Sequence, residues 1–308
     1  MLQPAVGAIS VRLASSPVAA RRELFVRADR VGLDHVGIGD HVSFYSGMGN
    51  DGLLGVSVVL TASERLRANT AVYLLPLRHP VPTARQLADI AAFAPGRFVF
   101  GVGIGGEDPH EVEICGVDPK TRGRRMDECL RIIRSLLTDE TTTFEGEFFS
   151  LQDARIRPSP SEPIPIVVGG RSDRAIRRAG ELGEGWFGLW VSPRRYGEAV
   201  AQMHEHAHAA GRTVPSWTNA LNVWCGVGAN ASEGRSYVAP AMETFYQLPY
   251  DRFEKWSPAG TPQAIAEFLV PYVAAGCSIF NLIINGRDGE AEVDAAGEIR
   301  ELIIDAVR

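Results

Sequence analysis

An aspartate and a histidine stand next to each other at Asp40-His41, directly after the apolar segment His35–Ile38. A histidine side chain exchanges a proton near neutral pH, and the carboxylate beside it is a second ionisable group. The pair therefore predicts a site of proton transfer. The alternative is structural, with His41 capping a loop or satisfying a local carbonyl group, and sequence position alone does not separate the two.

A cluster of glycines follows the apolar segment Phe98–Gly101. Gly101, Gly103 and Gly106 fit the spacing G-x-G-x-x-G of dinucleotide-binding folds, which needs a helix after the glycines. The segment Glu107–Cys115 allows two helical turns at most, and its acidic start would repel a phosphate. A ring or side chain of a cofactor, or only a tight turn, is the better explanation for the small residues. The residues expected beside such a ring are Gly103, Ile104 and Gly105.

A second glycine pair precedes a predicted helix, Asp173–Leu182. The sequence Gly169-Gly170-Arg171-Ser172 offers free amides, a guanidinium and a hydroxyl group to an anion. The alternative is that Ser172 or Asp173 caps the helix while Arg171 faces solvent. Position in the fold derived below favours a phosphate.

Other residue types carry less information. Aromatic side chains in or beside predicted strands could wall a flat ligand or simply pack: they are Trp186, Trp190 and Trp224. His204 and His208 share a helix face, but no acidic or cysteine ligand accompanies them, so we predict no metal site. The four cysteines lack the spacing of a zinc site or a disulfide framework. Neither G-x-S-x-G nor H-E-x-x-H occurs.

Composition places the chain among globular proteins, with 308 residues, 45% of them hydrophobic and 22% charged. A net charge of −6 argues against nucleic-acid or anionic-membrane partners. No segment approaches the roughly 20 apolar residues of a membrane span, and the N-terminus lacks the pattern of an export signal. We expect a cytoplasmic protein that acts on a small-molecule substrate.

These residues need a scaffold, and apolar strands alternate with amphipathic helices along the whole chain. This alternation is typical of a parallel sheet with crossover helices. The expected strands are Val6–Ile9, His35–Ile38, Thr70–Leu75, Phe98–Gly101, Ile164–Val168, Gly185–Leu189, Ala220–Gly226 and Ser278–Ile284. The expected helices are Ala19–Val31, Leu53–Thr61, Pro82–Ala94, Arg125–Thr138, Asp173–Leu182, Arg194–Ala210, Thr261–Ala275 and Glu292–Val307.

Eight such strands favour a TIM (β/α)8 barrel, with a Rossmann-type sheet as the alternative. We expect one domain over residues 1–308, with insertions at about 105–124, 141–163 and 229–259. The second contains a hairpin over Thr142–Leu151, and the third, Asn230–Ala259, is irregular and could form a lid. Active sites of TIM barrels lie where the strands end, which is where the residues above are predicted to lie.

Several motifs, in order along most of the chain, resemble the bacterial luciferase-like monooxygenase family. They are Gly39-Asp40-His41, Leu75-Pro-Leu-Arg-His-Pro80, Gly96-Arg-Phe-Val-Phe-Gly-Val-Gly103, Arg124-Arg-Met-Asp-Glu128, Ile166-Val-Val-Gly-Gly170, Arg177-Arg-Ala and Gly185-Trp186. The resemblance implies a TIM barrel with insertions that uses a flavin or a deazaflavin, and a homodimer.

The branch that uses coenzyme F420 is the most similar, because it carries an aspartate and a histidine at the end of strand two. The resemblance implies that Asp40 lies near the cofactor ring, that His41 donates or accepts a proton, and that a non-proline cis peptide lies near Val72-Tyr73, to within one residue. It implies cofactor contacts at Asp40, Val72, Tyr73, Gly103, Ile104, Gly105, Gly169, Gly170, Arg171, Ser172, Trp186 and Gly188. Gly106 replaces a catalytic glutamate of the sugar-phosphate dehydrogenases in this branch, which argues against their substrate.

The chemistry implied is hydride transfer between C5 of F420 and a small organic substrate, with His41 moving the accompanying proton. An FMN-dependent monooxygenase that uses reduced flavin and oxygen is the alternative within the family. A barrel that binds the cofactor without catalysis is a third possibility, against which the intact Asp40-His41 pair argues.

Overall fold

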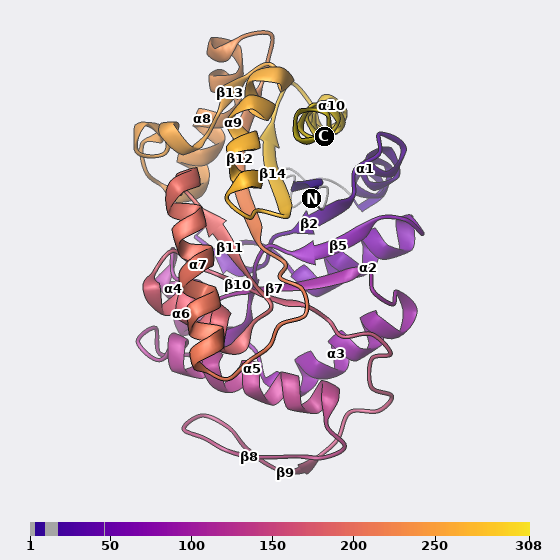
Figure 1. The fold of residues 1–308 in the computed structure, drawn as a ribbon, viewed down its shortest axis with the longest axis vertical. Coiled ribbons are helices and arrows are strands. Elements are labelled where there is room, and N and C mark those ends of the chain that lie inside the picture. The colour runs from indigo at the N-terminus through magenta and orange to yellow at the C-terminus, as the bar shows by residue number, and fades with distance from the viewer. Residues whose placement is uncertain (1–3, 10–17, 46) are drawn as a thin grey trace.

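Eight parallel strands close into a barrel in the computed structural model, which describes residues 4–9, 18–45 and 47–308 (Figure 1). The strands are β1 (Ala5–Ile9), β2 (His35–Ile38), β5 (Arg67–Thr70), β7 (Phe98–Gly103), β10 (Ile166–Gly169), β11 (Gly185–Leu189), β12 (Ala220–Val227) and β14 (Ile279–Asn285). The barrel is closed because β1 pairs with both β14 and β2, and β7 pairs with both β5 and β10. The predicted TIM barrel is confirmed, and the Rossmann-type alternative is excluded.

Helices surround the barrel, as the alternation in the sequence predicts. They are α1 (Val18–Arg30), α2 (Gly52–Ala62), α3 (Pro80–Phe93), α5 (Arg122–Thr138), α6 (Asp173–Leu182), α7 (Pro193–Ala209), α9 (Pro262–Ala274) and α10 (Gly289–Val307). Local chemistry fixes their starts, since the Ser192 and Thr261 side chains accept hydrogen bonds from amides of the first turns of α7 and α9. Both α7 and α9 have a proline as their first residue.

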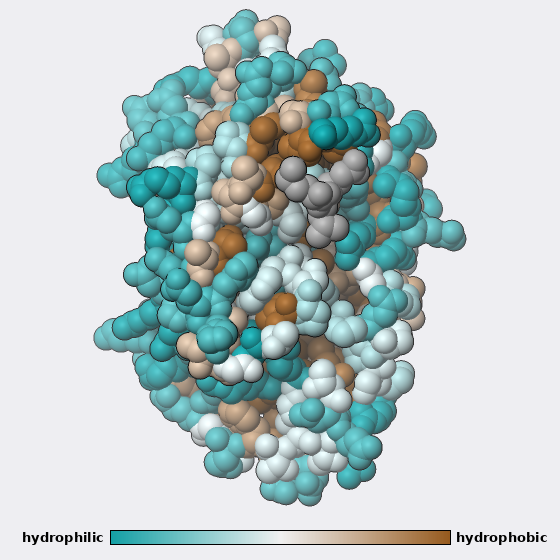
Figure 2. Space-filling model, viewed as in Figure 1, coloured by the Kyte–Doolittle hydropathy of each residue, from teal (hydrophilic) through white to brown (hydrophobic). Residues whose placement is uncertain are grey.

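Burial explains why the strands read as unbroken apolar runs. All residues of β2, β7 and β14 are buried, because one face of each strand fills the barrel and the other packs beneath the helices. The outer surface is different. Figure 2 shows a mostly hydrophilic face on which apolar residues form small separate groups. The expectation about an export signal falls partly on residues 1–3, which lie outside the described residues. Among the described residues, no helix is long and apolar enough to cross a membrane.

The third barrel strand differs from the prediction. Instead of one strand over Thr70–Leu75, the chain forms β5 and then a two-residue strand, β6 (Tyr73–Leu74), with a cis peptide bond between Ala71 and Val72. The cis bond lies one residue before the expected Val72-Tyr73 bond. The Leu74 amide, which would continue a regular strand, donates instead to a side-chain carboxylate from the end of β2 at 2.8 Å.

The segment Asn230–Ala259 is also more regular than predicted. It forms the 16-residue helix α8 (Ala231–Tyr246), followed by the 3-10 turns η3 (Tyr250–Arg252) and η4 (Glu254–Trp256) and by β13 (Ala259–Gly260). The prolines that indicated irregularity are tolerated because the Asn230 side chain caps the helix and buried Val238 and Met242 pack on the barrel. Helix α8 lies at the upper end of the molecule in Figure 1, against β12 and β14.

Two hairpins lie outside the barrel. The predicted one is present as β8 (Thr142–Glu145) and β9 (Ser150–Ala154), and it extends below α5 in Figure 1. Glu128 of α5 holds it by accepting hydrogen bonds from the amides of residues 147, 148 and 149. The second hairpin, β3 (His41–Phe44) and β4 (Met48–Asn50), was not predicted, and it begins where β2 ends.

Candidate active site

The histidine at the end of the second barrel strand is held by a glutamate from a different part of the chain. His41 Nδ1 lies 3.0 Å from Glu111 Oε2. The other oxygen of Glu111 accepts hydrogen bonds from the amides of Val42 at 2.6 Å and Ser43 at 3.1 Å. Glu111 belongs to the short helix α4 (Pro109–Ile114), which packs on β3. The helix and the hairpin are thus fastened together through one carboxylate.

The environment of Glu111 decides its charge. Its side chain is only 2% exposed, and burial alone would raise its pKa. Hydrogen bonds from His41 and from the Ser43 and Val42 amides oppose this effect, so that the pKa of Glu111 lies below its ordinary value. An ionised carboxylate only accepts hydrogen bonds, so His41 Nδ1 carries the hydrogen in this pair. Nε2 of a neutral His41 is then left as a proton acceptor.

An aromatic cluster covers this histidine. The ring of Phe44 lies 4.0 Å from that of His41, and Phe245 of α8 approaches to 5.8 Å. Phe245 also contacts Trp224 of β12 and Tyr246 of α8, at 5.6 and 4.9 Å between ring centroids. The end of α8 therefore lies over the mouth of the barrel, where it can keep water from His41.

Asp40 lies beside His41 in sequence but has a different environment. Its side chain has no exposed surface, and Arg78 binds both of its oxygens, at 2.6 and 2.9 Å. The amides of Gly52 and Leu74 donate to the same carboxylate at 2.9 and 2.8 Å. Burial raises the pKa of Asp40, while Arg78 and the two amides oppose the rise. All four contacts are internal, so Asp40 fixes the start of α2 and the turn after β6.

Val72 lies at the ends of two neighbouring strands, β7 and β10. A β-carbon added to Gly103 would collide with a methyl group of Val72, and one added to Gly169 would lie 3.1 Å from the other. Both glycines are therefore small for a reason within the protein itself. Val72 is half-buried, and it forms an apolar floor between the ends of β7 and β10.

The next glycines of that loop adopt left-handed backbone conformations, with φ of 66° at Gly105 and 125° at Gly106. The guanidinium of Arg122, from the start of α5, occupies the space that a side chain at residue 106 would need. Its buried Nε atom has no hydrogen-bond partner within the described residues. Ile104 is half-buried and packs on the core. The loop thus presents a cation where a dinucleotide fold would present a helix.

The second glycine pair is built by several local contacts. The Ser172 hydroxyl accepts a hydrogen bond from the Ala175 amide at 3.2 Å, so it caps α6, as the structural alternative had it. The Trp186 indole donates to the carbonyl oxygen of Gly170 at 2.7 Å. Arg171 extends over the ring of Trp190, with 4.8 Å from the guanidinium carbon to the ring centroid.

Three of the predicted contact positions are enclosed by the protein's own side chains. Tyr73 and Trp186 are each only 2% exposed. Tyr73 packs on Phe100 and beneath Arg78, and a β-carbon at Gly188 would collide with Tyr196 of α7. The structure brings together His41, Val72, Gly103, Gly105, Gly169, Gly170 and Arg171 at the strand ends.

Sequence reasoning missed Glu111, Arg122 and Phe245. Glu111 was part of an acidic segment interpreted only as repelling phosphate, and 70 residues separate it from His41. Buried polar residues at the end of a short helix would have been the only signal. In the described part of the chain, no group of three His, Cys, Asp or Glu residues could hold a metal ion.

Known proteins share this architecture. The family model described as luciferase-like monooxygenase matches residues 4–267. An uncharacterized protein of Mycobacterium tuberculosis is 38% identical over 162 residues, which are 51% of this chain and 56% of that protein. The chain therefore spans little more than half the length of the first curated relatives that it matches.

Longer matches exist at lower identity. An F420-dependent glucose-6-phosphate dehydrogenase of Kineococcus radiotolerans is 29% identical over 293 residues, which cover 85% of this chain and 86% of that enzyme. A solved structure of an F420-dependent secondary alcohol dehydrogenase in complex with an F420-acetone adduct superposes with a TM-score of 0.86 at 20% identity, covering 98% of this chain and 99% of that one. The superposition establishes the fold.

Proposed function

We propose, from the premise that this chain belongs to the luciferase-like monooxygenase family, that it is an F420-dependent oxidoreductase acting on a small organic substrate. The observation that carries the proposal is the His41–Glu111 pair together with the apolar floor of Val72, which follow the neighbouring barrel strands β2 and β5. A proton-exchanging group next to a flat apolar surface is what hydride transfer to or from a ring requires.

The residues at the strand ends fit the parts of such a cofactor. Val72, with Gly103 and Gly169 behind it, would support the flat ring. Arg122, whose buried Nε has no hydrogen-bond partner in the described residues, would hold its anionic part. When bound, F420 supplies or accepts the hydride at C5 of its ring. Asp40 would act one step away, by holding the turn after β6 that follows Val72.

The protein itself would supply the group that accepts or donates the proton. In the oxidation of an alcohol, the carbon loses a hydride and the hydroxyl group loses a proton, and Nε2 of His41 would accept that proton. Glu111 keeps the hydrogen on Nδ1 and stabilises the charge that forms on the ring. Phe44 and Phe245 exclude water around the imidazole. In the reverse direction, the same nitrogen would return the proton.

The competing candidate is an FMN-dependent monooxygenase, because the family model is described as a luciferase-like monooxygenase. Titration of the purified protein with coenzyme F420 and with FMN, followed by fluorescence, separates the two. We expect saturable binding of F420 at micromolar concentration, of the order found for cofactor and substrate sites. Binding of FMN without binding of F420 would replace the proposal by the monooxygenase.

We further propose that the protein is a homodimer. Exposed apolar side chains gather on adjoining elements, the β3–β4 hairpin, the first turn of α2 and the end of α4: Val42, Met48, Leu54 and Ile114 are 44%, 50%, 69% and 51% exposed. A cluster of this kind is typical of a protein interface. Light scattering after size exclusion should give twice the mass of 33.4 kDa, and Leu54→Glu should yield the monomer. A monomeric wild-type protein would contradict the proposal.

A further inference from the structure

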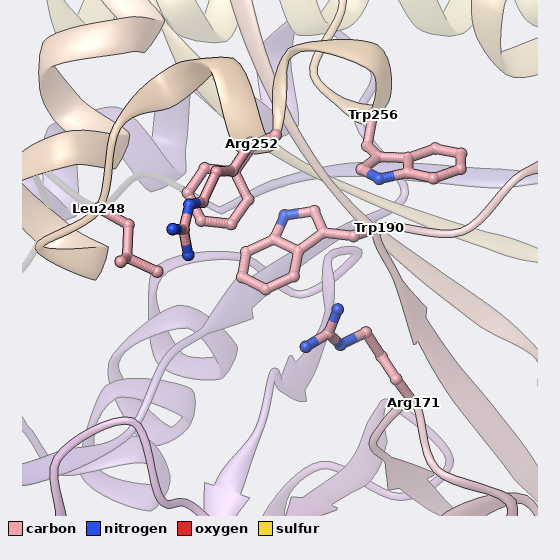
Figure 3. A pocket seen from close by; sticks show the side chains of 6 residues that line it. Arg171, Trp190, Leu248, Arg252 and Trp256 are labelled. Atoms are coloured by element: carbon pink, nitrogen blue, oxygen red, sulfur yellow. The ribbon is translucent and has the colours of Figure 1, made fainter.

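A cavity of about 260 Å³ lies at the barrel mouth, between the ends of β10 and β11 and the segment that follows α8. Its lining residues are Arg171, Trp190, Leu248, Arg252, Phe253 and Trp256. Figure 3 shows Arg171 and Arg252 on opposite sides of the Trp190 indole, with Trp256 above it. The walls are thus aromatic and aliphatic, and the polar groups are two guanidinium ions and two indole nitrogens.

The polar side chains that line this cavity are all hydrogen-bond donors. Its lining contains no carboxylate, hydroxyl or amide side chain. Within the described residues, neither guanidinium has an ion-pair or hydrogen-bond partner, and the buried Nε1 of Trp190 has no acceptor. Arg and Trp side chains only donate hydrogen bonds. A ligand that satisfies this cavity must therefore accept hydrogen bonds and carry negative charge.

The acidic residues that flank Arg252 in the sequence are engaged elsewhere. Asp251 and Glu254 flank Arg252 in the sequence, but both form ion pairs with Arg235, and the Asp251 pair measures 3.0 Å. Both acidic residues of this turn bind Arg235, so that Arg252 has no ion-pair partner within the described residues. This separation of charges leaves the two arginines of the cavity available to an external anion.

The aromatic walls define the remainder of the ligand. Trp190 has a φ of 50°, a left-handed conformation that is unusual for a bulky residue and that occurs most often at functional sites. Phe253 lies 4.5 Å from it, between ring centroids. The cavity volume of about 260 Å³ accommodates a single ring with its acidic group.

The cavity also belongs to the same covered region as His41. Tyr246 lies 4.7 Å from Trp190 and 4.9 Å from Phe245, and Phe245 in turn contacts His41. A molecule held here by its anionic end would extend its body along the aromatic cluster toward His41. Binding energy at such a remote handle can position the reacting carbon.

We infer that this cavity is the subsite for a carboxylate or phosphate group carried on a flat apolar substrate. The inference rests on the proposed function, because it names the substrate class of that enzyme. Arg171 and Arg252 would bind the anion by charge-assisted hydrogen bonds, while Trp190 and Trp256 would pack on the attached ring.

Titration of the wild-type protein with benzoate, phenyl phosphate and the neutral benzamide, followed by tryptophan fluorescence, tests this. We expect the two anions to bind at least about tenfold more tightly than benzamide, and added salt to weaken them. The double variant Arg171→Gln/Arg252→Gln should lose about tenfold or more in affinity for the anions. Arg194→Gln, at an exposed arginine of α7 that pairs with Glu198, is the control and should bind as wild type does.

Two results would overturn the inference: benzamide binding as tightly as benzoate, or unchanged anion affinity in the double variant. Both arginines are exposed, so the variant should fold, which circular dichroism checks. Titration with F420 shows whether this cavity binds the anionic group of the substrate or that of the cofactor. Unchanged F420 affinity in the double variant supports a substrate subsite, whereas an equal loss of F420 affinity would assign the cavity to the cofactor's acidic part and overturn the proposal. Anion binding by a wild-type protein that does not bind F420 would refute the proposed function alone.

Discussion

The polar groups on the two sides of the barrel mouth differ in whether they have partners within the protein. Around His41, the polar groups that we identify are matched internally: Arg78 binds Asp40 and Glu111 binds His41. Around Trp190, two guanidinium ions and a buried indole nitrogen have no acceptor in the described residues. The two guanidinium groups are exposed, whereas burial of the unpaired indole nitrogen is costly. We interpret the matched side as the part that fixes geometry and the unmatched side as the part that awaits an anion.

This comparison makes distinct predictions for each side, and the largest concerns His41. His41→Ala should lower kcat by about 10²–10⁴-fold, the usual contribution of general acid–base catalysis. F420 binding should remain, because Val72 and Arg122 are unchanged. Steady-state kinetics and F420 titration measure the two effects, with His208→Ala on the exposed face of α7 as control. Unchanged turnover would remove the proton-transfer role from His41.

The Asp40–Arg78 pair should determine stability. Asp40→Asn would remove the carboxylate that binds both terminal nitrogens of Arg78, which is 18% exposed, and would leave Asp51, 4.0 Å away, as its counter-charge. Breaking a buried pair in this way costs about 3–5 kcal/mol. Urea denaturation measures the free energy of unfolding. Asp89→Asn, which removes an exposed ion pair with Arg85, should change it by less than about 0.5 kcal/mol. Equal effects of the two substitutions would show that Asp40 is not a structural anchor.

A further matched group lies inside the barrel and predicts a pH dependence. His35 is buried, its Nε2 lies 2.8 Å from Asn281 Oδ1, and burial lowers its pKa to about 4. The unfolded chain binds a proton below its ordinary pKa of 6.5, and the folded protein does not until about pH 4. The contribution of His35 to the free energy of unfolding should therefore be fully present above pH 6.5. It should fall by up to about 3 kcal/mol as the pH decreases to 4.

Unfolding free energies measured across this range test that dependence. His35→Gln should flatten the part of the curve that belongs to this residue, because glutamine does not titrate. A curve with the same slope in the variant would assign the acid sensitivity to other groups.

The smallest effect should come from Glu111, which acts through another residue. Glu111→Gln should reduce kcat by about 10–100-fold, as loss of a supporting carboxylate commonly does, while KM changes little. The neighbouring Glu113→Gln, on the exposed face of the same helix, provides the matched control. A rise in KM with normal kcat would instead indicate that Glu111 contacts the substrate.

The sequence predicts the barrel well because buried parallel strands are uninterrupted apolar runs and each is followed by an amphipathic helix. It fails where three-dimensional contacts override local pattern. The strand predicted over Thr70–Leu75 is interrupted at Ala71 and Val72, after which the Leu74 amide donates to Asp40. Helix α8 forms despite Pro240 because its apolar face packs on the barrel. No spacing rule connects Glu111 to His41, since only the fold brings α4 to β3.

A crystal structure of the protein with coenzyme F420 would test the central claim most directly. The account predicts that the ring lies on Val72 with C5 facing the side of the mouth that carries His41, and that the Asp40–Arg78 and His41–Glu111 pairs remain intact. A ring bound away from Val72, or a cofactor that breaks the Asp40–Arg78 pair to reach Asp40, would contradict the account.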